Sequence, residues 1–267
     1  MGRGRGIDHV GIATHNLDGL AAEYEALGFT LTPRAYHQDH MGTSNRLVQF
    51  EGRNFIELLE VDRPETMLPH GPDFMGFGQF NHDFLAKREG MSLIIFQTED
   101  TAADLARWKA KGLDVYDQFN FERQATLPDG SQATVRFELG FVTSPAIPDV
   151  LFYVCDNKAE EHFWKPEYQS HANGAHGMIS LTLCVDDPAA GADFLGALFD
   201  GLTNETPEGY GVRCGGGGIE LRRPEQCKDY GWDTPPLGAI GMGIDCAARR
   251  GTTTHPADAG NVFIRWV

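Results

Sequence analysis

One arrangement of elements recurs along this chain of 267 residues: a strand, a capped helix and then two or three further strands. The first copy spans residues 7–61, the second 91–155, and the third begins at Gly177. A shorter fourth copy pairs 238–244 with 261–267 and has a polar loop, 249–259, in place of its helix. This recurrence predicts a repeated α+β fold, because each unit must bury its apolar faces against a neighbour.

Polar residues mark where each helix begins. Asn16 precedes an expected helix over 17–28, Asp100 one that ends at Gly112, and Asp187 one that starts with Pro188. Asn and Asp side chains accept hydrogen bonds from the first free backbone N–H groups of a helix. An Asp129-Gly130 pair indicates a hairpin turn. The strands that we expect are 7–14, 29–33, 46–51, 54–61, 91–98, 115–123, 134–141, 150–155, 177–185, 211–214, 218–221, 238–244 and 261–267.

The composition narrows the class of partner. Hydrophobic residues make up 41% and charged residues 22%, which is ordinary for a globular protein. A net charge of −16 argues against nucleic acid and against anionic membranes as partners. No apolar run approaches the roughly 20 residues of a membrane span. Five scattered cysteines without a CxxC pair favour reduced thiols in a cytoplasmic protein.

One histidine and one glutamate of the first copy stand where chemistry could occur. His9 lies on its first strand and Glu57 on its last. Two such side chains in one concave sheet can bind a divalent metal or act as an acid/base pair. Strand alternation puts Glu57 on the same face as Phe55 and Leu59, in a partly apolar cavity. The alternative is a core histidine at position 9 whose ring nitrogens bond to the backbone.

A loop in the same copy offers a further polar group. His37, Asp39 and His40 precede Gly42, in the segment that leads to the third strand. This segment could fold over the mouth of the cavity. His40 is then the best third metal ligand or a general base, and the alternative is a solvated polar loop.

Several short matches, taken in order, suggest a family. They are Ile7-Asp8-His9-Val10, the block 40–45, Phe55-Ile56-Glu57-Leu58, the block 171–174 and the block 256–260. In these the chain resembles the vicinal oxygen chelate superfamily and its glyoxalase-like domain proteins. The resemblance implies βαβββ modules that form cupped mixed sheets with helices on the outside. Residues 1–156 would form a first pair of modules, 157–175 an aromatic linker, and 176–267 a second, truncated pair.

The resemblance also implies a divalent metal (Zn, Fe, Mn, Ni or Mg) in the cup, with His9 and Glu57 as ligands. Alignment of the modules puts Leu93 opposite His9 and Tyr153 opposite Glu57. The third module has Ser180 and Glu220 at these positions, and the fourth has Ile264 or Arg265. Neither pair therefore has a full ligand set, and two protein ligands alone hold a divalent ion weakly.

The remaining predictions concern the ligand. Leu93, Phe152 and Tyr153 are expected to form an apolar wall. Trp164, His171 and Asn173 in the linker either line the pocket or form a packed clamp between modules. Two functions stay open: an enzyme of isomerase, lyase or dioxygenase type that acts on a small carbonyl or aromatic compound, and a protein that only binds or sequesters such a molecule. Whether the protein forms a homodimer also stays open.

Overall fold

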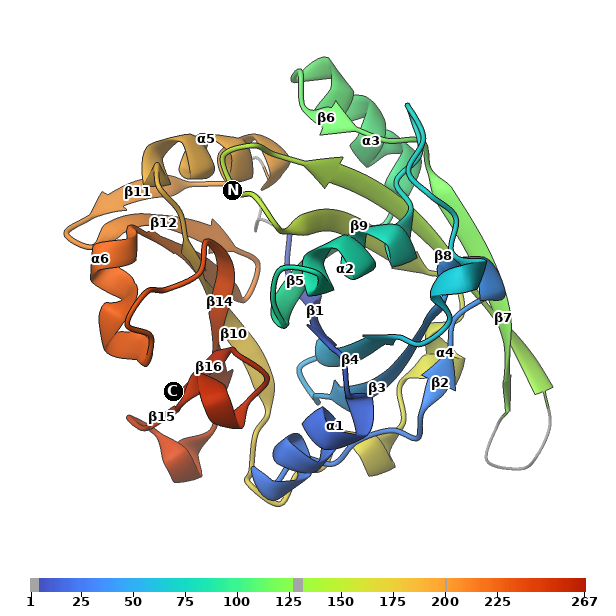
Figure 1. Cartoon of the computed structure of the whole chain (residues 1–267), viewed down its shortest axis with the longest axis horizontal. Helices are drawn as coiled ribbons and strands as arrows, with labels where there is room; N and C mark the ends of the chain where they lie inside the picture. Colours follow the sequence, from blue (N-terminus) through green and yellow to red (C-terminus); the bar gives the residue numbers. More distant parts are fainter. Residues whose placement is uncertain (1–4, 127–131, 200) are drawn as a thin grey trace.

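The computed structural model describes residues 5–126, 132–199 and 201–267, and its strands form two curved sheets (Figure 1). The first sheet has the order β2-β3-β4-β1-β5-β9-β8-β6, and β7 also pairs with β8. Its strands are β1 (Ile7–Thr14), β2 (Ala35–Tyr36), β3 (Thr43–Gln49), β4 (Phe55–Val61), β5 (Gly90–Gln97), β6 (Asp114–Val115), β7 (Phe119–Thr126), β8 (Gln132–Thr143) and β9 (Leu151–Asn157).

The second sheet has the order β11-β12-β13-β10-β14-β16-β15. Its strands are β10 (Gly177–Cys184), β11 (Thr203–Thr206), β12 (Gly209–Cys214), β13 (Gly217–Arg222), β14 (Gly238–Asp245), β15 (Thr253–Thr254) and β16 (Phe263–Trp266). In each sheet, the first strands of two units pair antiparallel at the centre, β1 with β5 and β10 with β14. Each of these strands pairs parallel with the last strand of its own unit. The predicted α+β fold of repeated βαβββ units is confirmed.

Helices connect and cover the strands. The α-helices are α1 (Leu17–Ala26), α2 (Phe77–Leu85), α3 (Thr101–Ala110), α4 (Glu160–Phe163), α5 (Pro188–Phe199) and α6 (Pro224–Cys227). Short 3-10 helices are η1 (Asp39–Met41), η2 (Pro64–Thr66), η3 (Pro166–Tyr168), η4 (Lys228–Tyr230), η5 (Ala247–Arg249) and η6 (Pro256–Asp258). Within the described residues, no helix is long and apolar enough to span a membrane.

The predicted caps begin the three helices α1, α3 and α5. Asn16 Oδ1 accepts a hydrogen bond from Gly19 N at 3.0 Å, and Asp100 Oδ1 accepts one from Ala103 N at 2.9 Å. Asp187 Oδ1 accepts from the backbone N–H groups of two residues in the first turn of α5. These bonds satisfy N–H groups that have no partner inside the helix.

Three predicted segments differ in the structure. Residues 29–33 are not a strand, because only Thr32 bonds to Leu47 of β3 and Pro33 has no N–H to extend the ladder. The segment 115–123 is divided between β6 and β7. The stretch 69–84 is rich in glycine and aromatic residues, a composition that predicts a loop, but it contains most of α2. The predicted turn at Asp129-Gly130 lies outside the described residues.

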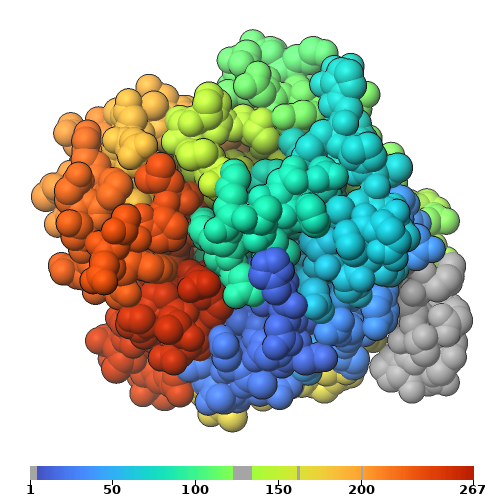
Figure 2. Space-filling view, in the orientation of Figure 1, coloured from blue at the N-terminus to red at the C-terminus, as the bar shows by residue number. Residues whose placement is uncertain are grey.

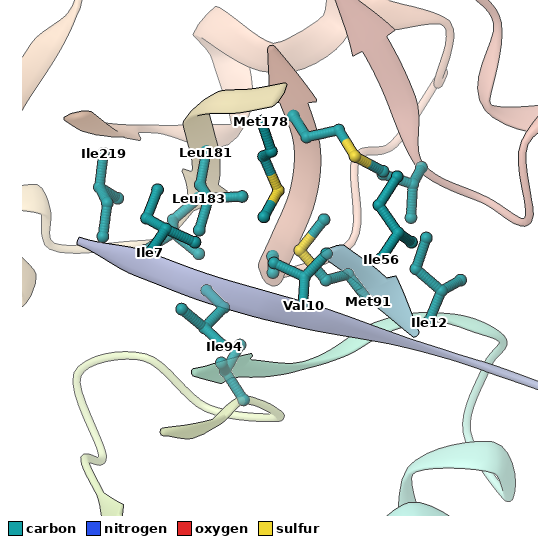
Figure 3. Packing of buried hydrophobic residues seen from close by; sticks show 14 of the residues in the cluster. Ile7, Val10, Ile12, Ile56, Met91, Ile94, Met178, Leu181, Leu183 and Ile219 are labelled. Atoms are coloured by element: carbon teal, nitrogen blue, oxygen red, sulfur yellow. The ribbon is translucent and has the colours of Figure 1, made fainter. Parts of the chain in front are cut away.

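One large core joins the two sheets. Figure 3 shows Val10 of β1 and Met91 and Ile94 of β5 facing Met178 and Leu181 of β10 across it. Side chains of α1, α3 and α5 belong to the same cluster of buried residues. The N-terminal half (blue to cyan) and the C-terminal half (orange to red) are accordingly in direct contact in the space-filling view (Figure 2). This core uses one face of the first sheet and leaves the opposite face to line a separate pocket.

Candidate functional site

The pocket lies over the face of the first sheet that is turned away from the shared core. It contains about 510 Å³ free of protein atoms, counted out to its open mouth. Apolar side chains from four strands, two helices and η1 form most of its wall: Met41, Leu47, Phe55, Phe77, Phe121, Phe137, Leu139 and Phe163. Polar groups also reach it: His9, His37, Asn45, Glu57, Tyr153 and Cys155. Apolar walls with a few converging polar groups are typical of small-molecule sites.

His9 is held on three sides. Its Nδ1 lies 2.5 Å from Asp8 Oδ1, and its Nε2 lies 3.4 Å from the Tyr153 hydroxyl. The ring stacks on Phe55 with 4.0 Å between ring centroids. The pairing of β1 with β5 shifts register between Ile7 and His9, and this irregularity contains Asp8. Such a bulge can re-aim a side chain, which here brings the carboxylate of Asp8 to the imidazole of the next residue.

Glu57 forms a second polar group on the neighbouring strand β4. Its Oε1 accepts a hydrogen bond from Asn45 Nδ2 at 2.6 Å and lies 3.5 Å from His37 Nε2. His37 Nδ1 in turn lies 2.8 Å from Thr43 Oγ1. Glu57 is only 4% exposed, and buried carboxylates need such partners. The structure thus brings His9 and Glu57 into one pocket, each beside a partner that orients it.

The electrostatics of the pocket keep two other groups protonated. Burial raises the pKa of Tyr153 well above its ordinary value, and the charge of Glu57 adds to this effect. Burial likewise raises the pKa of Cys155, with contributions from Asp8 and Glu57. Tyr153 therefore offers a hydroxyl that can donate a hydrogen bond, and Cys155 offers a neutral thiol, which is a poor nucleophile.

The register of the sheet agrees with the predicted alignment of the modules. Gly11 lies opposite Glu57 in the β1–β4 pair, and Ile95 lies opposite Tyr153 in the β5–β9 pair. His9 lies two residues before Gly11 on β1, and Leu93 lies two residues before Ile95 on β5. His9 and Leu93 therefore occupy equivalent positions in the two modules. Leu93 is fully buried below the pocket, where a Cβ added at Gly11 would come within 2.5 Å of its Cδ1. It supports the pocket floor and is not one of the described residues that line it.

Two other predicted residues lie away from the pocket. Phe152 points to the opposite face of β9, into the shared core, where its ring lies 5.2 Å from that of Phe194. Strand alternation explains this, because its neighbour Tyr153 takes the pocket side. His40 is half-buried in η1, and its ring lies against Phe119 at 5.7 Å between centroids. The histidine of this loop that lines the pocket is His37.

The linker residues form a clamp. His171 Nδ1 accepts from Thr30 N at 3.0 Å, and its Nε2 lies 2.9 Å from Gln49 O. Asn173 bonds to the backbone of residues 27 and 175. Trp164 packs behind the pocket wall, 6.0 Å from Phe55 between ring centroids. Trp164, His171 and Asn173 thus form the packed clamp, whereas Phe163 of the same segment lines the pocket.

Three residues of the site were not selected from the sequence. The sequence could have indicated Asp8, because a carboxylate next to His9 can reach the imidazole wherever the strand is irregular. His37 lies six residues before Thr43 and Asn45 two residues after it, and their meeting at Glu57 depends on how η1 turns the chain. Sequence spacing alone gave no reason to prefer His37 over His40.

The equivalent place on the second sheet is occupied by an ion-pair cluster. Glu220 of β13 bonds to Arg222 at 3.0 Å and to Arg265 of β16 at 3.3 Å. Arg265 also donates to the Tyr230 hydroxyl at 3.0 Å. Of the two candidates in the fourth unit, Arg265 therefore faces Glu220, whereas Ile264 is buried in the shared core. The carboxylate that matches Glu57 is neutralised by arginine.

The donor set of the first pocket does not suit a divalent ion. Of the four ligand positions that the resemblance implies, only those of His9 and Glu57 carry usual ligands for a divalent ion. The other two positions of the predicted set hold Leu93 and Tyr153. Among residues 5–126, 132–199 and 201–267, no three His, Cys, Asp or Glu side chains are gathered so that they could hold a metal ion. The metal predicted from the resemblance gains no support from these residues.

Comparisons with known proteins agree with this architecture. A sequence model described as a glyoxalase-like domain matches residues 7–199. A hypothetical protein from Staphylococcus aureus superposes with a TM-score of 0.75 at 13% identity, over 98% of each chain. A xylose isomerase-like TIM barrel/4-hydroxyphenylpyruvate dioxygenase fusion protein gives a TM-score of 0.51 at 15% identity, over 91% of this chain and 37% of that one. No match was found among curated proteins.

These structural likenesses, at low identity, establish the fold. The family match extends from β1 to the end of α5 and covers well over half of the chain. It includes the complete first sheet and every described residue that lines the pocket. The chain therefore belongs to the glyoxalase-like domain family, within the vicinal oxygen chelate superfamily.

Proposed function

We propose that this protein is an enzyme that moves a proton on a small carbonyl compound bound in the first pocket. The observation that carries the proposal is the run from Asp8 through His9 to Tyr153, which ends at an apolar wall. Carboxylate, imidazole and hydroxyl in this order supply an oriented base beside a hydrogen-bond donor. Isomerisation or elimination next to a carbonyl group needs these two elements.

His9 is the base in this proposal. The Asp8 carboxylate favours the tautomer with a proton on Nδ1, which leaves the lone pair of Nε2 at the pocket beside the Tyr153 hydroxyl. A substrate C–H bond next to a carbonyl gives its proton to Nε2, and the electron pair moves onto the carbonyl oxygen. The resulting imidazolium is stabilised by Asp8, and its proton can return to carbon.

Tyr153 and Glu57 complete the proposed roles. The Tyr153 hydroxyl stays protonated and can donate to the carbonyl oxygen as negative charge develops there. Glu57, held by Asn45 beside His37, is the second group that can exchange a proton with the ligand. The apolar walls favour a flat or compact organic body, and the pocket volume favours a small molecule over a polymer. All five cysteines are free thiols, which favours a cytoplasmic enzyme.

A second candidate is a protein that only binds such a ligand. Most of the pocket wall is apolar, and apolar contacts alone can hold a hydrophobic molecule. The same polar groups would then only orient the ligand. The two functions differ in one observable, which is the loss of a substrate proton.

Exchange of α-protons for deuterium tests the proposal. Uncharged aromatic and alicyclic ketones are incubated with the protein in D₂O, and the exchange is followed by NMR. We expect exchange with the wild type, and a loss of about 100-fold or more in His9→Ala. Tyr153→Phe should slow exchange while ligand binding persists. Ketones that bind but show no exchange above background would favour the sequestering function.

A further inference from the structure

Two cysteines that are far apart in the sequence meet at the second sheet. Cys184 is the last residue of β10, and Cys227 is the last residue of α6. Both are fully buried, in a small cluster of buried residues with Ile240 and Phe263. Their side chains share a hydrogen bond, and both are free thiols. These two residues therefore form a dithiol.

The register of the second sheet brings the two sulfur atoms together. Cys184 lies opposite Arg222 in the parallel ladder between β10 and β13, and Val185 N donates to Arg222 O at 2.9 Å just beyond it. The chain leaves β13 at Arg222 and enters α6 at Pro224. Because α6 is about one helical turn long, its last residue, Cys227, stays close to the end of the strand from which the helix starts.

The surroundings make the two thiols unequal. The hydrogen bond with Cys184 lowers the pKa of Cys227 from its ordinary value and the charge of Arg222 also lowers it, whereas burial opposes them. The same hydrogen bond, together with burial, raises the pKa of Cys184. Cys227 is accordingly the thiol that ionises first, and the thiolate is the form of cysteine that reacts with oxidants. Cys184 stands beside it as a second thiol that can complete a disulfide.

The other three cysteines have different surroundings. Cys246 donates to Asn173 O at 3.1 Å. Cys214 lies in the core shared by the two sheets, where burial raises its pKa to about 12. Burial also raises the pKa of Cys155 at the first pocket well above its ordinary value. Oxidation should therefore favour the dithiol over these three residues.

We propose that Cys184 and Cys227 form an oxidation site, at which hydrogen peroxide converts the dithiol into a disulfide between β10 and α6. The Cys227 thiolate attacks one oxygen of the peroxide, the O–O bond breaks, and a sulfenic acid and hydroxide form. Hydroxide takes up the proton that Cys227 released. The sulfur of Cys184 then attacks the oxidised sulfur, the S–O bond breaks, and the oxygen leaves as water with the proton of Cys184. In sum, two thiols are oxidised, one peroxide is reduced and two waters form.

The helix α6 is the route by which peroxide reaches the buried pair. Glu225 in this short helix is exposed, as are Lys228 and Asp229, which follow it. Short elements at the surface open locally at low cost in free energy, and hydrogen peroxide is little larger than water. The new bond would join α6 covalently to the end of a central strand and so oppose this opening. The inference concerns the second sheet and does not rest on the proposed function of the first pocket.

Peptide mapping of the intact, folded protein tests the inference. The reduced wild type is treated with a few equivalents of hydrogen peroxide, and the remaining thiols are alkylated during unfolding. The digest is then analysed by mass spectrometry without reductant. We expect a linked peptide that contains Cys184 and Cys227, at least about tenfold more abundant than any other linked peptide. Dithiothreitol should restore both thiols.

Variants and hydrogen exchange assign the order of events. In Cys184→Ala the disulfide cannot form, so dimedone should trap a sulfenic acid at Cys227. Cys214→Ala is the matched control, because it also removes a buried thiol, and it should form the same disulfide as the wild type. Amide exchange over residues 224–230 should be slower in the oxidised wild type than in the reduced one. Circular dichroism establishes that the variants are folded, and the wild-type map does not depend on them.

Two results would overturn the inference. One is a peroxide-treated wild type in which Cys184 and Cys227 are still recovered as alkylated thiols. The other is a disulfide between different cysteines that is at least as abundant as the expected one. Neither result bears on the exchange of ketone protons at the first pocket, so the two proposals can fail separately.

Discussion

Two histidines, His9 and His171, show how the surroundings of a side chain decide its use. His9 has one nitrogen bonded to Asp8 and the other beside the Tyr153 hydroxyl at the pocket. His171 has both nitrogens engaged with backbone groups and sits between the rings of Phe29 and Phe50. The first arrangement places the imidazole at a pocket, and the second holds the linker against the sheet.

His171 should make stability depend on pH. Burial lowers its pKa from 6.5, so the folded protein favours neutral imidazole. Above that value the ring is neutral in both states. As the pH falls below it, the unfolded chain binds a proton that the folded chain resists, and the free energy of unfolding decreases by up to about 1.4 kcal/mol per pH unit.

Urea unfolding of the wild type and His171→Gln at about pH 8 and pH 5.5 measures this effect. The loss of stability on acidification should be smaller in the variant, because the other titrating groups are common to both proteins. An equal loss in the two proteins would show that His171 does not contribute.

Asp8 should act through the tautomer of His9. In Asp8→Asn the Nδ1 proton loses its charged acceptor, so the ¹⁵N shifts of His9 should move toward a mixture of tautomers. Deuterium exchange with ketones should fall by about 10- to 100-fold. Unchanged shifts together with a lower rate would mean that Asp8 acts on the rate by another route.

The sequence was sufficient to predict His9, Glu57 and Tyr153 at pocket positions, because strand order and alternation determine which side chains share a face. It was not sufficient to choose between His37 and His40. That choice depends on η1, which turns His40 toward Phe119 and leaves His37 beside Glu57. Phe152 was expected at the pocket, but strand alternation directs it into the shared core and puts its neighbour Tyr153 at the pocket.

Among the helices and strands, α2 is the α-helix near the pocket that was not predicted from the sequence. Its buried positions, Phe77, Asn81, Phe84 and Leu85, follow helical spacing, but glycines and aromatic residues around them indicated a loop. The helix packs against η1, and Phe77 closes one side of the pocket. By contrast, α1, α3 and α5 were predictable because each has an Asn or Asp cap and an apolar stripe.

A glycine sets the distance between α2 and η1. A Cβ added at Gly78 would lie 2.0 Å from Met41 O, and a backbone oxygen cannot rotate away. We therefore expect Gly78→Ala to lower the free energy of unfolding by roughly 1–3 kcal/mol and to weaken ketone binding.

Gly71→Ala serves as the control, since its Cβ would meet its nearest neighbour at an ordinary 3.4 Å. Urea titration and ligand titration measure the two effects. If Gly78→Ala were as stable as Gly71→Ala, α2 could not be packed against η1 as the structure has it.

At the scale of the whole molecule, the two sheets depend on each other. Their apolar faces share one core, and Trp108 of α3 donates from its indole nitrogen to Leu198 O of α5 at 2.9 Å. Because Glu220 is paired with arginines, we assign the second sheet no acid/base chemistry and infer that it stabilises the first sheet through the shared core. The division into residues 1–156, 157–175 and 176–267 stays a prediction, as does a homodimer.

The shared core predicts cooperative unfolding. Far-ultraviolet circular dichroism and tryptophan fluorescence should give coincident urea transitions, because neither sheet can keep its apolar face covered alone. Two separated transitions would show that the halves unfold independently and that the common core contributes little.

In the proposed function, the pocket around His9 and Glu57 performs acid/base chemistry. The most direct test compares α-deuterium exchange of an uncharged aromatic ketone by the wild type, His9→Gln and His40→Gln. The two variants make the same change, one inside the pocket and one outside it. We predict that His9→Gln loses exchange by about 100-fold or more, while His40→Gln retains it. Exchange that persists in folded His9→Gln, or that is lost in His40→Gln, would contradict the account.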